Sequence, residues 1–301
     1  MINKPAIAKN TKGINPDKVL LWENTRKEIR ESLKSGDLKA AIIPTGSTEQ
    51  HSEHLALCTD IAMATFVSQQ VALKLYPKVT VSTPCPVGYS PYHMARKGTL
   101  SIRRETFKAY VFDIAESLAA HGINNILVIN GHGGNGGLLE ESVGEWREKL
   151  GVTMEVLSYW SMLSTEDHEK YLQTYQDARD GKLSEVEKSA LSHASEFETS
   201  LLMAAYPERV RSITMEEYDD AKLNYAQSSL SSEVISYYKR HYSEEEWPER
   251  IEAEHNGRDR ARHQQALLGT VEKGQALLDL LTNRIGQKIE NMIEATGSSA
   301  D

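Results

Sequence analysis

Residues 125–150, NILVINGHGGNGGLLEESVGEWREKL, decide the fold class of this 301-residue chain. Asn125 to Ile129 form a short apolar run, which is typical of a strand buried on both faces. A glycine-rich segment with a single histidine follows at 131–137, and helical periodicity then runs from about Leu138 to Leu150. A strand that passes through such a segment into a helix indicates the βαβ unit of a parallel sheet.

The same alternation of short apolar runs and helical patterns extends through most of the chain. We predict further strands at 40–44, 79–82 and 154–157 and helices at 19–35, 61–75, 106–121, 192–206 and 265–294. Strands that alternate with helices of this length favour an α/β fold with a mainly parallel sheet covered on both faces. In such sheets, ligands bind at the carboxyl ends of the strands.

Composition narrows the class of protein. Hydrophobic residues make up 40% and charged residues 26% of the chain, which excludes wholesale disorder and fibres. The formal net charge of −9 argues against binding to a nucleic-acid backbone, which requires a basic face. No apolar run has the length of a membrane span or a signal peptide, and Cys58 and Cys85 are expected to be free thiols. We expect a cytoplasmic enzyme with a small-molecule substrate and no membrane or nucleic-acid partner.

The densest group of potential metal ligands follows the first predicted strand. Glu49, His51, Glu53 and His54 lie within six residues of one another, and Asp60 opens the next helix. In extended chain, Glu49 and His51 point to the same side of their loop. The two oxygens of a carboxylate can bridge two ions, which a histidine cannot do.

Two later segments complete the pattern. His132 lies in the glycine-rich segment, and His193 and Glu196 are three residues apart on one face of a predicted helix. Each of these residues has an ordinary alternative role, as a surface charge, a helix cap or a buried histidine. Taken together, their mixed nitrogen and oxygen ligands predict a site for two divalent ions, with zinc, manganese or iron as candidates.

The glycine-rich segment also allows an interpretation as a phosphate cradle, because it joins a strand to a helix. It lacks the Lys-Ser/Thr ending of a P-loop and the spacing of a dinucleotide-binding loop. His132 also places an imidazole where a dinucleotide loop requires a small residue. The metal site is therefore the favoured interpretation.

Three motifs, in this order, resemble those of the creatininase (creatinine amidohydrolase) family. They are Pro44–His51 with Asp60, Asn130–Asn135, and His193–Ser200 followed by Pro207. The likeness extends from about Val19 to Ile285. It implies a three-layer α/β/α domain, a homohexamer, and two divalent metal ions per subunit, with zinc expected first.

The resemblance also implies roles for individual residues. Glu49 and His132 match ligands of one ion. His51 matches a ligand of the other ion, and Asp60 matches the bridging carboxylate. His193 matches a residue that shuttles protons.

The remaining ligand of the second ion is where this chain departs from creatininase. That enzyme has a glutamate two residues after the histidine of the glycine-rich motif, and this chain has Gly134 there. By resemblance to relatives with the same Gly-His-Gly-Gly-Asn motif, we expect Glu196 to replace it. Glu198 is its competitor and is also a candidate catalytic residue.

The expected substrate pocket departs from creatininase as well. Trp160 matches a residue of the pocket wall, and His93, Gly133 and Gly134 are further candidates for substrate binding. A second pocket tryptophan is replaced by Ser189, and Arg96-Lys97 places two positive charges near the expected rim. Creatinine itself is therefore not the expected substrate.

We predict a metal-dependent hydrolase of a small cyclic amide or formamide. One alternative is cleavage of a C–C bond in a cyclic polyol-derived diketone on the same two-metal site, and another is a non-catalytic relative. The expected organisation is an N-terminal arm at 1–18, a single domain at 19–294 with a helical insertion at about 210–262, and a flexible tail at 295–301. We interpret the insertion as a lid over the pocket or a subunit contact.

Overall fold

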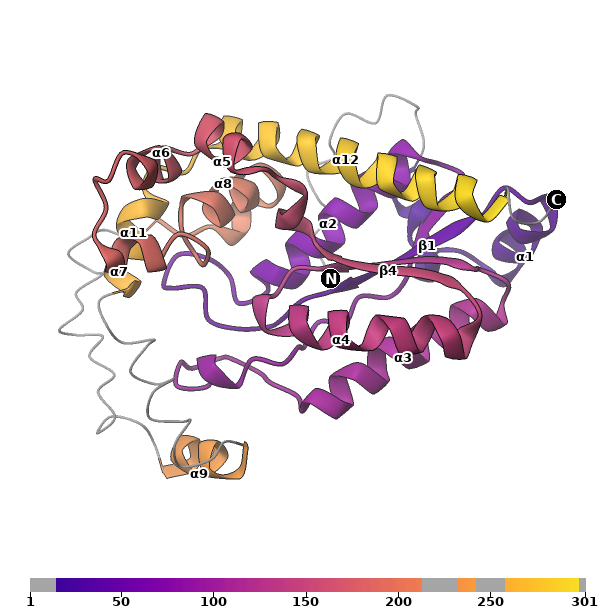
Figure 1. Cartoon of the computed structure of the whole chain (residues 1–301), viewed down its shortest axis with the longest axis horizontal. Helices are drawn as coiled ribbons and strands as arrows, with labels where there is room; N and C mark the ends of the chain where they lie inside the picture. The colour runs from indigo at the N-terminus through magenta and orange to yellow at the C-terminus, as the bar shows by residue number, and fades with distance from the viewer. Residues whose placement is uncertain (1–14, 213–231, 242–257, 298–301) are drawn as a thin grey trace.

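Four parallel strands form the centre of the protein in the computed structural model, which describes residues 15–212, 232–241 and 258–297 (Figure 1). The strands are β1 (Ala40–Thr45), β2 (Val79–Val81), β3 (Asn125–Asn130) and β4 (Thr153–Ser158). They lie in the order β2-β1-β3-β4, and every neighbouring pair is parallel. The predicted α/β class with a parallel sheet is confirmed.

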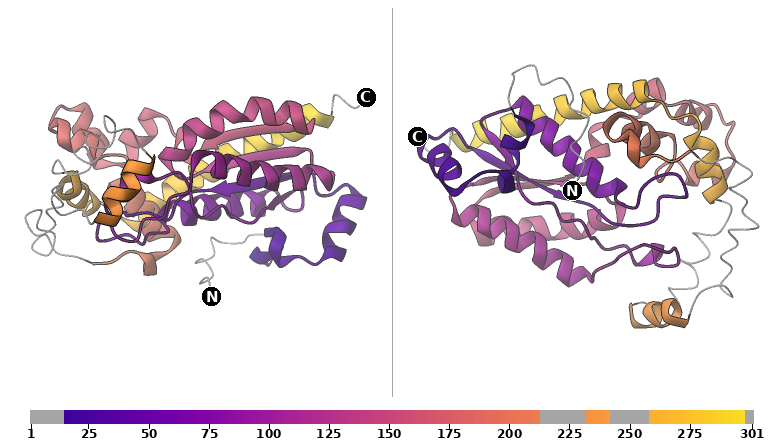
Figure 2. Two further views of the ribbon diagram at one scale, coloured as in Figure 1. Left: turned by 90° about the horizontal axis from the view of Figure 1, so that it is seen from below. Right: turned by 180° about the vertical axis from the view of Figure 1, so that it is seen from behind.

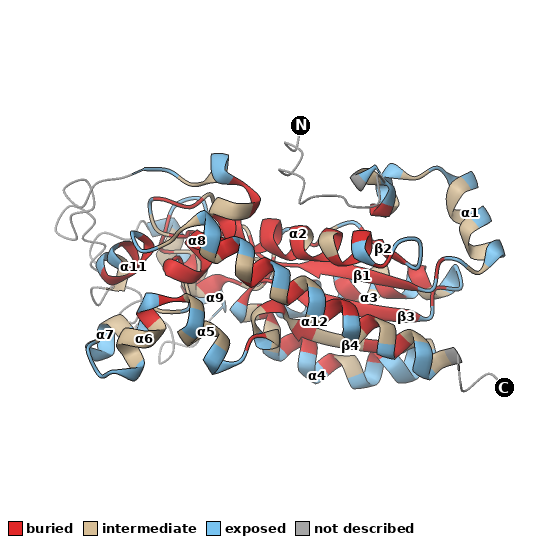
Figure 3. Ribbon diagram, turned by 90° about the horizontal axis from the view of Figure 1, so that it is seen from above, coloured by how far each residue is buried: buried red, intermediate tan, exposed pale blue. Residues whose placement is uncertain are grey.

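Helices cover both faces of the sheet because both faces are apolar. Ala40 and Ile42 point to one side, where they pack with α2 (Thr59–Lys74) and α12 (Val271–Gly297). Ala41 and Ile43 point to the other side, where they pack with α3 (Arg104–Ala120) and α4 (Gly133–Leu150). Successive residues of a strand face opposite sides, so these four side chains belong to two separate cores. Figure 1 shows the sheet between these two helical layers, and Figure 3 shows that its strands are buried.

Shorter helices gather at one end of the molecule, where α5 to α8 and α11 lie together (Figures 1 and 2). The remaining elements are η1 (Pro16–Val19), η2 (Leu21–Glu23), α1 (Arg26–Ser35), η3 (Pro91–His93), η4 (Tyr159–Met162), α5 (Thr165–Tyr171), α6 (Gln173–Arg179), α7 (Glu185–Ser189), α8 (Glu196–Ala205), η5 (Pro207–Arg209), α9 (Ser232–His241) and α11 (Arg258–Ala266).

Two helices begin at residues other than those predicted. The predicted helix at 19–35 is two short 3-10 turns followed by α1, because Thr25 and Glu28 form a capping box that starts the helix at Arg26. The predicted loop at 131–137 is mostly helix, since α4 begins at Gly133. The glycines are thus the first turns of a helix, and the His132 backbone caps it.

The C-terminal prediction also needs correction. The predicted helix at 265–294 is divided by residues 267–270, which separate α11 from α12. Helix α12 continues to Gly297, so the first residues of the predicted tail are helical. Of the predicted insertion, the structure describes 210–212, α9 and the first residues of α11. Residues 1–14 of the predicted arm and 298–301 of the tail lie outside the described residues.

None of the helices in the described part of the chain combines the length and the apolar character that a bilayer crossing requires.

Candidate metal centre

Three strands end in register at one edge of the sheet, and the predicted ligands follow these ends. Thr45 of β1 pairs with Asn130 of β3, and Asn130 pairs with Ser158 of β4. Glu49 and His51 lie in the loop after β1. Asp60 and His132 lie at the N-termini of α2 and α4.

Two glycines allow these segments to approach each other. A Cβ atom at Gly46 would overlap the backbone of Ile61, at the start of α2. A Cβ atom at Gly131 would overlap the carbonyl oxygen of Asp60. Any other residue at either position would push the N-terminus of α2 away from the sheet edge, so these glycines set the position of Asp60.

The ring of His132 is oriented by its hydrogen bond to the backbone. Its Nε2 atom lies 3.0 Å from the carbonyl oxygen of Tyr89, which can only accept, so Nε2 carries the proton. Nδ1 then faces two carboxylates, at 3.2 Å from Glu49 Oε2 and 3.1 Å from Asp60 Oδ2. A backbone carbonyl that fixes the tautomer in this way is typical of histidines that bind metals.

His51 is held in the same manner. Its Nδ1 atom lies 3.2 Å from the carbonyl oxygen of Glu49 and therefore donates to it. Nε2 faces Asp60 Oδ1 at 2.9 Å and Glu198 Oε2 at 3.7 Å. Both oxygens of Asp60 are thus used, one toward His51 and one toward His132, as expected of a carboxylate between two ions.

Glu198 joins this cluster and Glu196 does not. The Glu196 carboxylate accepts hydrogen bonds from the backbone N–H groups of Gln173 and Thr174, at 3.1 and 2.8 Å, and it forms an ion pair with Lys273. Helix α8 begins at Glu196, so the two glutamates lie about 200° apart around its axis. The expectation that Glu196 approaches the other ligands is not met, and its competitor Glu198 takes that place.

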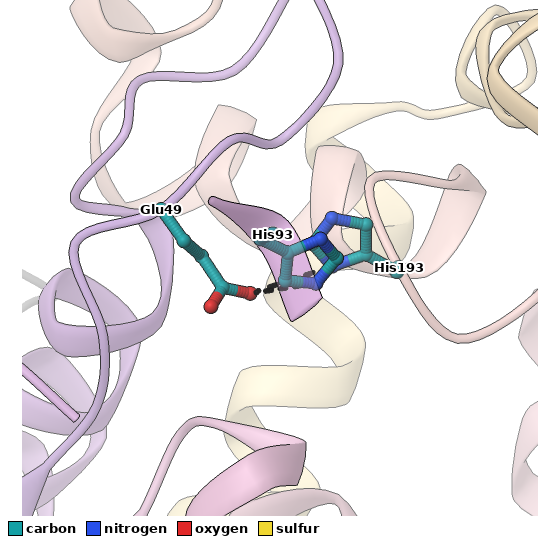
Figure 4. Close-up of side chains that lie close together, drawn as sticks. All are labelled: Glu49, His93 and His193. Atoms are coloured by element: carbon teal, nitrogen blue, oxygen red, sulfur yellow. Dashed lines mark ion pairs between the residues drawn. The ribbon is translucent and has the colours of Figure 1, made fainter. Parts of the chain in front are cut away.

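His193 and His93 form the open side of the cluster. Their rings stack with centroids 4.8 Å apart, and the Glu49 carboxylate points toward both (Figure 4). Oε1 of Glu49 lies 3.4 Å from His93 Nε2 and 3.9 Å from His193 Nδ1. His193 also lies against His51, with ring centroids 4.3 Å apart.

Three further residues hold these side chains and were not predicted from the sequence. Gln50 lies between two predicted ligands, and its amide Nε2 donates to His93 Nδ1 at 2.9 Å. Ser90 donates a hydrogen bond to Glu49, and the Tyr92 hydroxyl lies 3.1 Å from His132 Nε2. Ser90 and Tyr92 follow β2, so the rule that places ligands at the carboxyl ends of strands was sufficient to find them.

Strained backbone marks two positions beside these histidines. Ser52, with φ 55°, directly follows His51, and Ala194, with φ 49°, directly follows His193. The left-handed region is unfavourable for residues other than glycine. Such strain persists where the surrounding structure enforces it, as it does at functional sites.

The charged neighbours in the cluster and the burial of its side chains change the pKa of several of its residues. Burial opposes a charge on His51, but Asp60 and Glu198 raise its pKa to about 10. Burial likewise opposes a charge on His132, yet Glu49 raises its pKa well above the ordinary value. Burial raises the pKa of Glu198 to about 7. The buried carboxylates thus draw positive charge to both histidines.

The same buried carboxylates fit a divalent cation. His51 Nε2 and Asp60 Oδ2 are buried and make no hydrogen bond within the part of the chain that the structure describes, although charged atoms lie within about 3 Å of each. Among the residues that the structure describes, possible ligand atoms within 4.8 Å of one another form three overlapping groups: Glu49, Asp60 and His132; His51, His193 and Glu198; and Glu49, His93 and His193. The cluster can therefore hold metal ions, and neither cysteine belongs to it.

A cavity of about 510 Å³ opens onto this cluster. Of the residues predicted to bind substrate, Trp160, His93 and Gly133 line it, and Gly134 is not part of its lining. A Cβ atom at Gly134 would overlap the hydroxyl of Tyr92, so this glycine provides room for a neighbouring side chain. Ser189, at the position where creatininase resemblance predicts a tryptophan, also lines the cavity.

The predicted positive rim has a different origin from the one expected. Arg96 is buried and forms an ion pair with Asp259 of α11, and Lys97 is exposed. Neither residue lines the cavity. Arg258 and Arg262 of α11 line it instead, so its positive charges come from the end of the predicted insertion.

The fold and the site together define a parallel α/β protein whose buried histidines and carboxylates, at the carboxyl edge of the sheet, could hold metal ions. Residues 22–289 match the family model of creatininase, described as creatinine amidohydrolase. The match covers most of the chain, and the protein belongs to the creatininase family.

Individual relatives carry different hydrolase names. The chain is 37% identical over 119 residues to 3-dehydro-scyllo-inosose hydrolase of Thermotoga maritima, covering 39% of this chain and 37% of that protein. It is 35% identical over 113 residues to a mycofactocin precursor peptide peptidase of Mycobacterium ulcerans, covering 35% and 45%. It is 29% identical over 203 residues to creatinine amidohydrolase of Pseudomonas putida, covering 64% and 74%. The first two alignments thus span less than half of each relative.

The fold is shared with solved creatininase structures. A structure titled "Creatininase Mn" matches with a TM-score of 0.67 at 23% identity, over 91% of this chain and 98% of the other. This likeness confirms the three-layer α/β/α architecture that the sequence resemblance implied.

Proposed function

We propose that the protein is a metal-dependent hydrolase that cleaves a C–N bond in a small cyclic amide or formamide. One observation carries the proposal: His51 and His132 each bond to a backbone carbonyl through one ring nitrogen, and their other ring nitrogens converge on the buried carboxylate of Asp60. Family membership and the hydrolase names of the relatives support it.

In the proposed ligand set, Asp60 would contribute to the binding of both divalent ions. Glu49 and His132 would hold the first ion, and His51 and Glu198 the second. Divalent ions at this position would lower the pKa of a water molecule and polarise a substrate carbonyl. Zinc and manganese both accept these nitrogen and oxygen ligands, and a structure with a shared fold carries manganese by its title.

The proposed proton carrier is His193. Its Nε2 atom lies 3.0 Å from the carbonyl oxygen of Gln50 and donates to it, which leaves Nδ1 facing the cluster. Burial lowers the pKa of His193 well below its ordinary value, with His51 and Arg262 adding to the effect. A neutral histidine of this kind can accept the proton that the attacking water loses and then release it readily to the leaving group. Gly133 lines the cavity at the N-terminus of α4. The backbone N–H groups at a helix N-terminus can stabilise a developing negative charge.

A second candidate is cleavage of a C–C bond in a cyclic polyol-derived diketone on the same site. The relative named 3-dehydro-scyllo-inosose hydrolase favours it, because by its name that protein hydrolyses an inosose, and the chain is 37% identical to it over 119 residues. The non-catalytic alternative has less support, because the carboxylates and histidines of the cluster are all present.

One experiment tests the function. Metal content is measured in the purified protein, and hydrolysis of creatinine, hydantoin, N-formyl compounds and cyclic diketones is screened with and without EDTA. We expect about two divalent ions per chain and turnover that EDTA abolishes. Full turnover in the metal-free protein would refute the proposal. Size-exclusion chromatography with light scattering on the same sample tests the proposed homohexamer.

A further inference from the structure

Part of the cavity wall comes from two short helices that carry none of the proposed metal ligands. His168 of α5 and Tyr175 of α6 both line the cavity, and their rings stack with centroids 4.6 Å apart. The His168 ring also contacts the ring of Phe197, at 5.4 Å between centroids. Phe197 directly precedes Glu198 on α8, so contact runs from the metal cluster to the stacked pair. The three helices lie together at one end of the molecule (Figure 1).

The ring of His168 has one nitrogen bonded to its own helix. Nδ1 lies 2.8 Å from the carbonyl oxygen of Ser164, which can only accept, so Nδ1 carries a proton. In the neutral ring, Nε2 is then a hydrogen-bond acceptor, and it has no partner among the residues that the structure describes. Because Tyr175 covers one face of the ring, the edge that carries Nε2 is left to meet a ligand in the cavity.

The hydroxyl of Tyr175 is the second polar group of the pair. The residue is half-buried and lines the cavity, and within residues 15–212, 232–241 and 258–297 its hydroxyl makes no hydrogen bond. Burial raises the pKa of Tyr175, and the negative charge of Glu198 adds to the effect. The hydroxyl therefore keeps its proton, lies within electrostatic reach of the metal cluster, and can donate a hydrogen bond to a ligand.

Buried contacts hold both helices in place without a ligand. At the start of α6, the Glu196 carboxylate accepts hydrogen bonds from the backbone N–H groups of Gln173 and Thr174 and from the Thr174 hydroxyl. At the start of α5, Asp167 forms an ion pair with Arg284 of α12. Glu196 thus serves to fix the helix that presents the tyrosine. Polar groups that are already in position bind a ligand without the entropy cost of ordering them.

The pair is complementary to an uncharged group that both donates and accepts hydrogen bonds. Nε2 of His168 can accept from an O–H or N–H group of a ligand, and the Tyr175 hydroxyl can donate to an oxygen of the same group. A ligand with a methyl group at this place would leave both atoms without a partner, which is unfavourable. The cavity volume of about 510 Å³ suits a small molecule.

We propose that His168 and Tyr175 form a specificity site, which binds an uncharged substrate group that both donates and accepts hydrogen bonds, such as a hydroxyl. This group belongs to a different part of the substrate from the carbonyl that reaches the metal ions. The position of that carbonyl rests on the proposed function. The hydrogen bonds of the His168–Tyr175 pair stand independently of it.

Calorimetry on the zinc-loaded protein at slightly alkaline pH is the first test. The probes are propano-, butano- and pentanohydroxamic acids with a terminal hydroxyl, each compared with the hydroxamic acid in which a methyl group replaces that hydroxyl. We expect at least one hydroxyl probe to bind about tenfold more tightly than its methyl counterpart, because the methyl group forms neither hydrogen bond. Acetohydroxamic acid, which does not extend beyond the zinc-binding group, should bind wild type and all variants within about twofold.

Tyr175→Phe is the primary variant because it removes one oxygen atom and keeps the stacked ring. The hydroxyl preference should fall at least threefold in Tyr175→Phe and in His168→Phe, and it should persist in Tyr171→Phe. Tyr171 lies on α5 and does not line the cavity, so its substitution is a matched control. Three results overturn the proposal: no hydroxyl preference in wild type, an unchanged preference in Tyr175→Phe or in His168→Phe, and an equal loss in Tyr171→Phe.

A second test separates this inference from the proposed function. Phenol and toluene differ by a hydroxyl in place of a methyl group, and ligand-observed NMR measures their dissociation constants with metal-free wild type, Tyr175→Phe and Tyr171→Phe. If acetohydroxamic acid does not bind the zinc-loaded protein, the proposed metal site has failed and this titration alone decides. A phenol preference that is lost in Tyr175→Phe alone supports the specificity site. A preference that is absent in wild type, or equal in all three proteins, overturns it.

Discussion

At the scale of single residues, His51 and His132 are each oriented by one ring nitrogen that donates a hydrogen bond to a backbone carbonyl. His51 and His132 use opposite ring nitrogens for this purpose, Nδ1 and Nε2, and each turns its other nitrogen toward Asp60. The energetic consequence is that the rings are already oriented before any ion binds. Little side-chain entropy then remains to be lost on binding.

Two glutamates of α8 provide a matched comparison. In Glu198→Gln the second ion loses a proposed ligand, and we expect the metal content to fall from about two ions to about one per chain. In Glu196→Gln the metal content should stay near two, because Glu196 bonds to Thr174 and Lys273 instead. Elemental analysis of both variants makes the measurement. Loss of metal in Glu196→Gln with retention in Glu198→Gln would show that the assignment is reversed.

His54 should make stability depend on pH. Burial lowers the pKa of His54 to about 3, helped by His263 and His51. Between pH 6.5 and about 3 the unfolded chain therefore binds a proton that the folded protein excludes. The free energy of unfolding should fall as the pH drops through this range, by up to about 1.4 kcal/mol per pH unit from this residue.

Urea unfolding at several pH values measures this dependence. In His54→Asn the slope between pH 6.5 and 4 should be shallower than in wild type, whatever the absolute stability of the variant. In wild type, the Nε2 atom of His54 forms a hydrogen bond with Thr199 Oγ1 at 3.0 Å. An asparagine side chain can partly replace this hydrogen bond. Parallel slopes for the two proteins would contradict the low pKa.

At the scale of secondary-structure elements, the N-termini of α2 and α4 are brought together by the absence of side chains. Gly131 lies directly against the Asp60 carbonyl oxygen, and the chain then enters α4 through His132. This contact places Asp60 of α2 beside His132 at the start of α4. The glycines are therefore needed for the approach of two helices, and not for a flexible loop.

Two glycine substitutions test this interpretation. Gly131→Ala should destabilise the protein by about 1–3 kcal/mol and lower its metal affinity, because the methyl group forces α2 outward. Gly144→Ala should stabilise it by about 0.5–1 kcal/mol and leave metal binding unchanged. Gly144 lies in α4 with open space around its Cα. Thermal unfolding and zinc titration check both, and equal effects of the two substitutions would exclude the close approach.

Elements with strong periodicity were predicted well from the sequence, and helix starts were not. The four strands and α2 and α3 lie within a few residues of their predicted bounds, because continuous burial requires apolar residues throughout. The start of α4 was missed because three-dimensional packing overrides the low helix propensity of glycine. The start of α1 was predicted too early because the Thr25 capping box was overlooked.

The identity of the residues in the candidate site was predicted better from the sequence than their arrangement in space. Glu49, His51, Asp60 and His132 were found because strand ends meet at one edge of the sheet. The choice between Glu196 and Glu198 depends on which face of α8 is turned to the site. Because both faces carry an acidic residue, the sequence does not decide between them. The arginines of α11 were missed because they lie far along the chain from every motif.

For the molecule as a whole, metal binding should be a source of stability. Zinc at one hundred times its dissociation constant should raise the free energy of unfolding by about 2.7 kcal/mol, because the unfolded chain does not preserve the cluster. Calorimetric scans with zinc and with EDTA measure the difference. Asp60→Asn, which removes the shared carboxylate charge, should abolish most of the gain. A gain of the same size in this variant would place the bound zinc elsewhere.

The two ends of the cavity are encoded by stretches of chain that are far apart. Residues that gather around Asp60 come from 49–198, whereas the arginines come from a segment that begins beyond 257. The ion pair between Arg96 and Asp259 joins this later segment to the residues that follow η3. The cavity wall is therefore complete only after the last part of the chain has folded onto the rest.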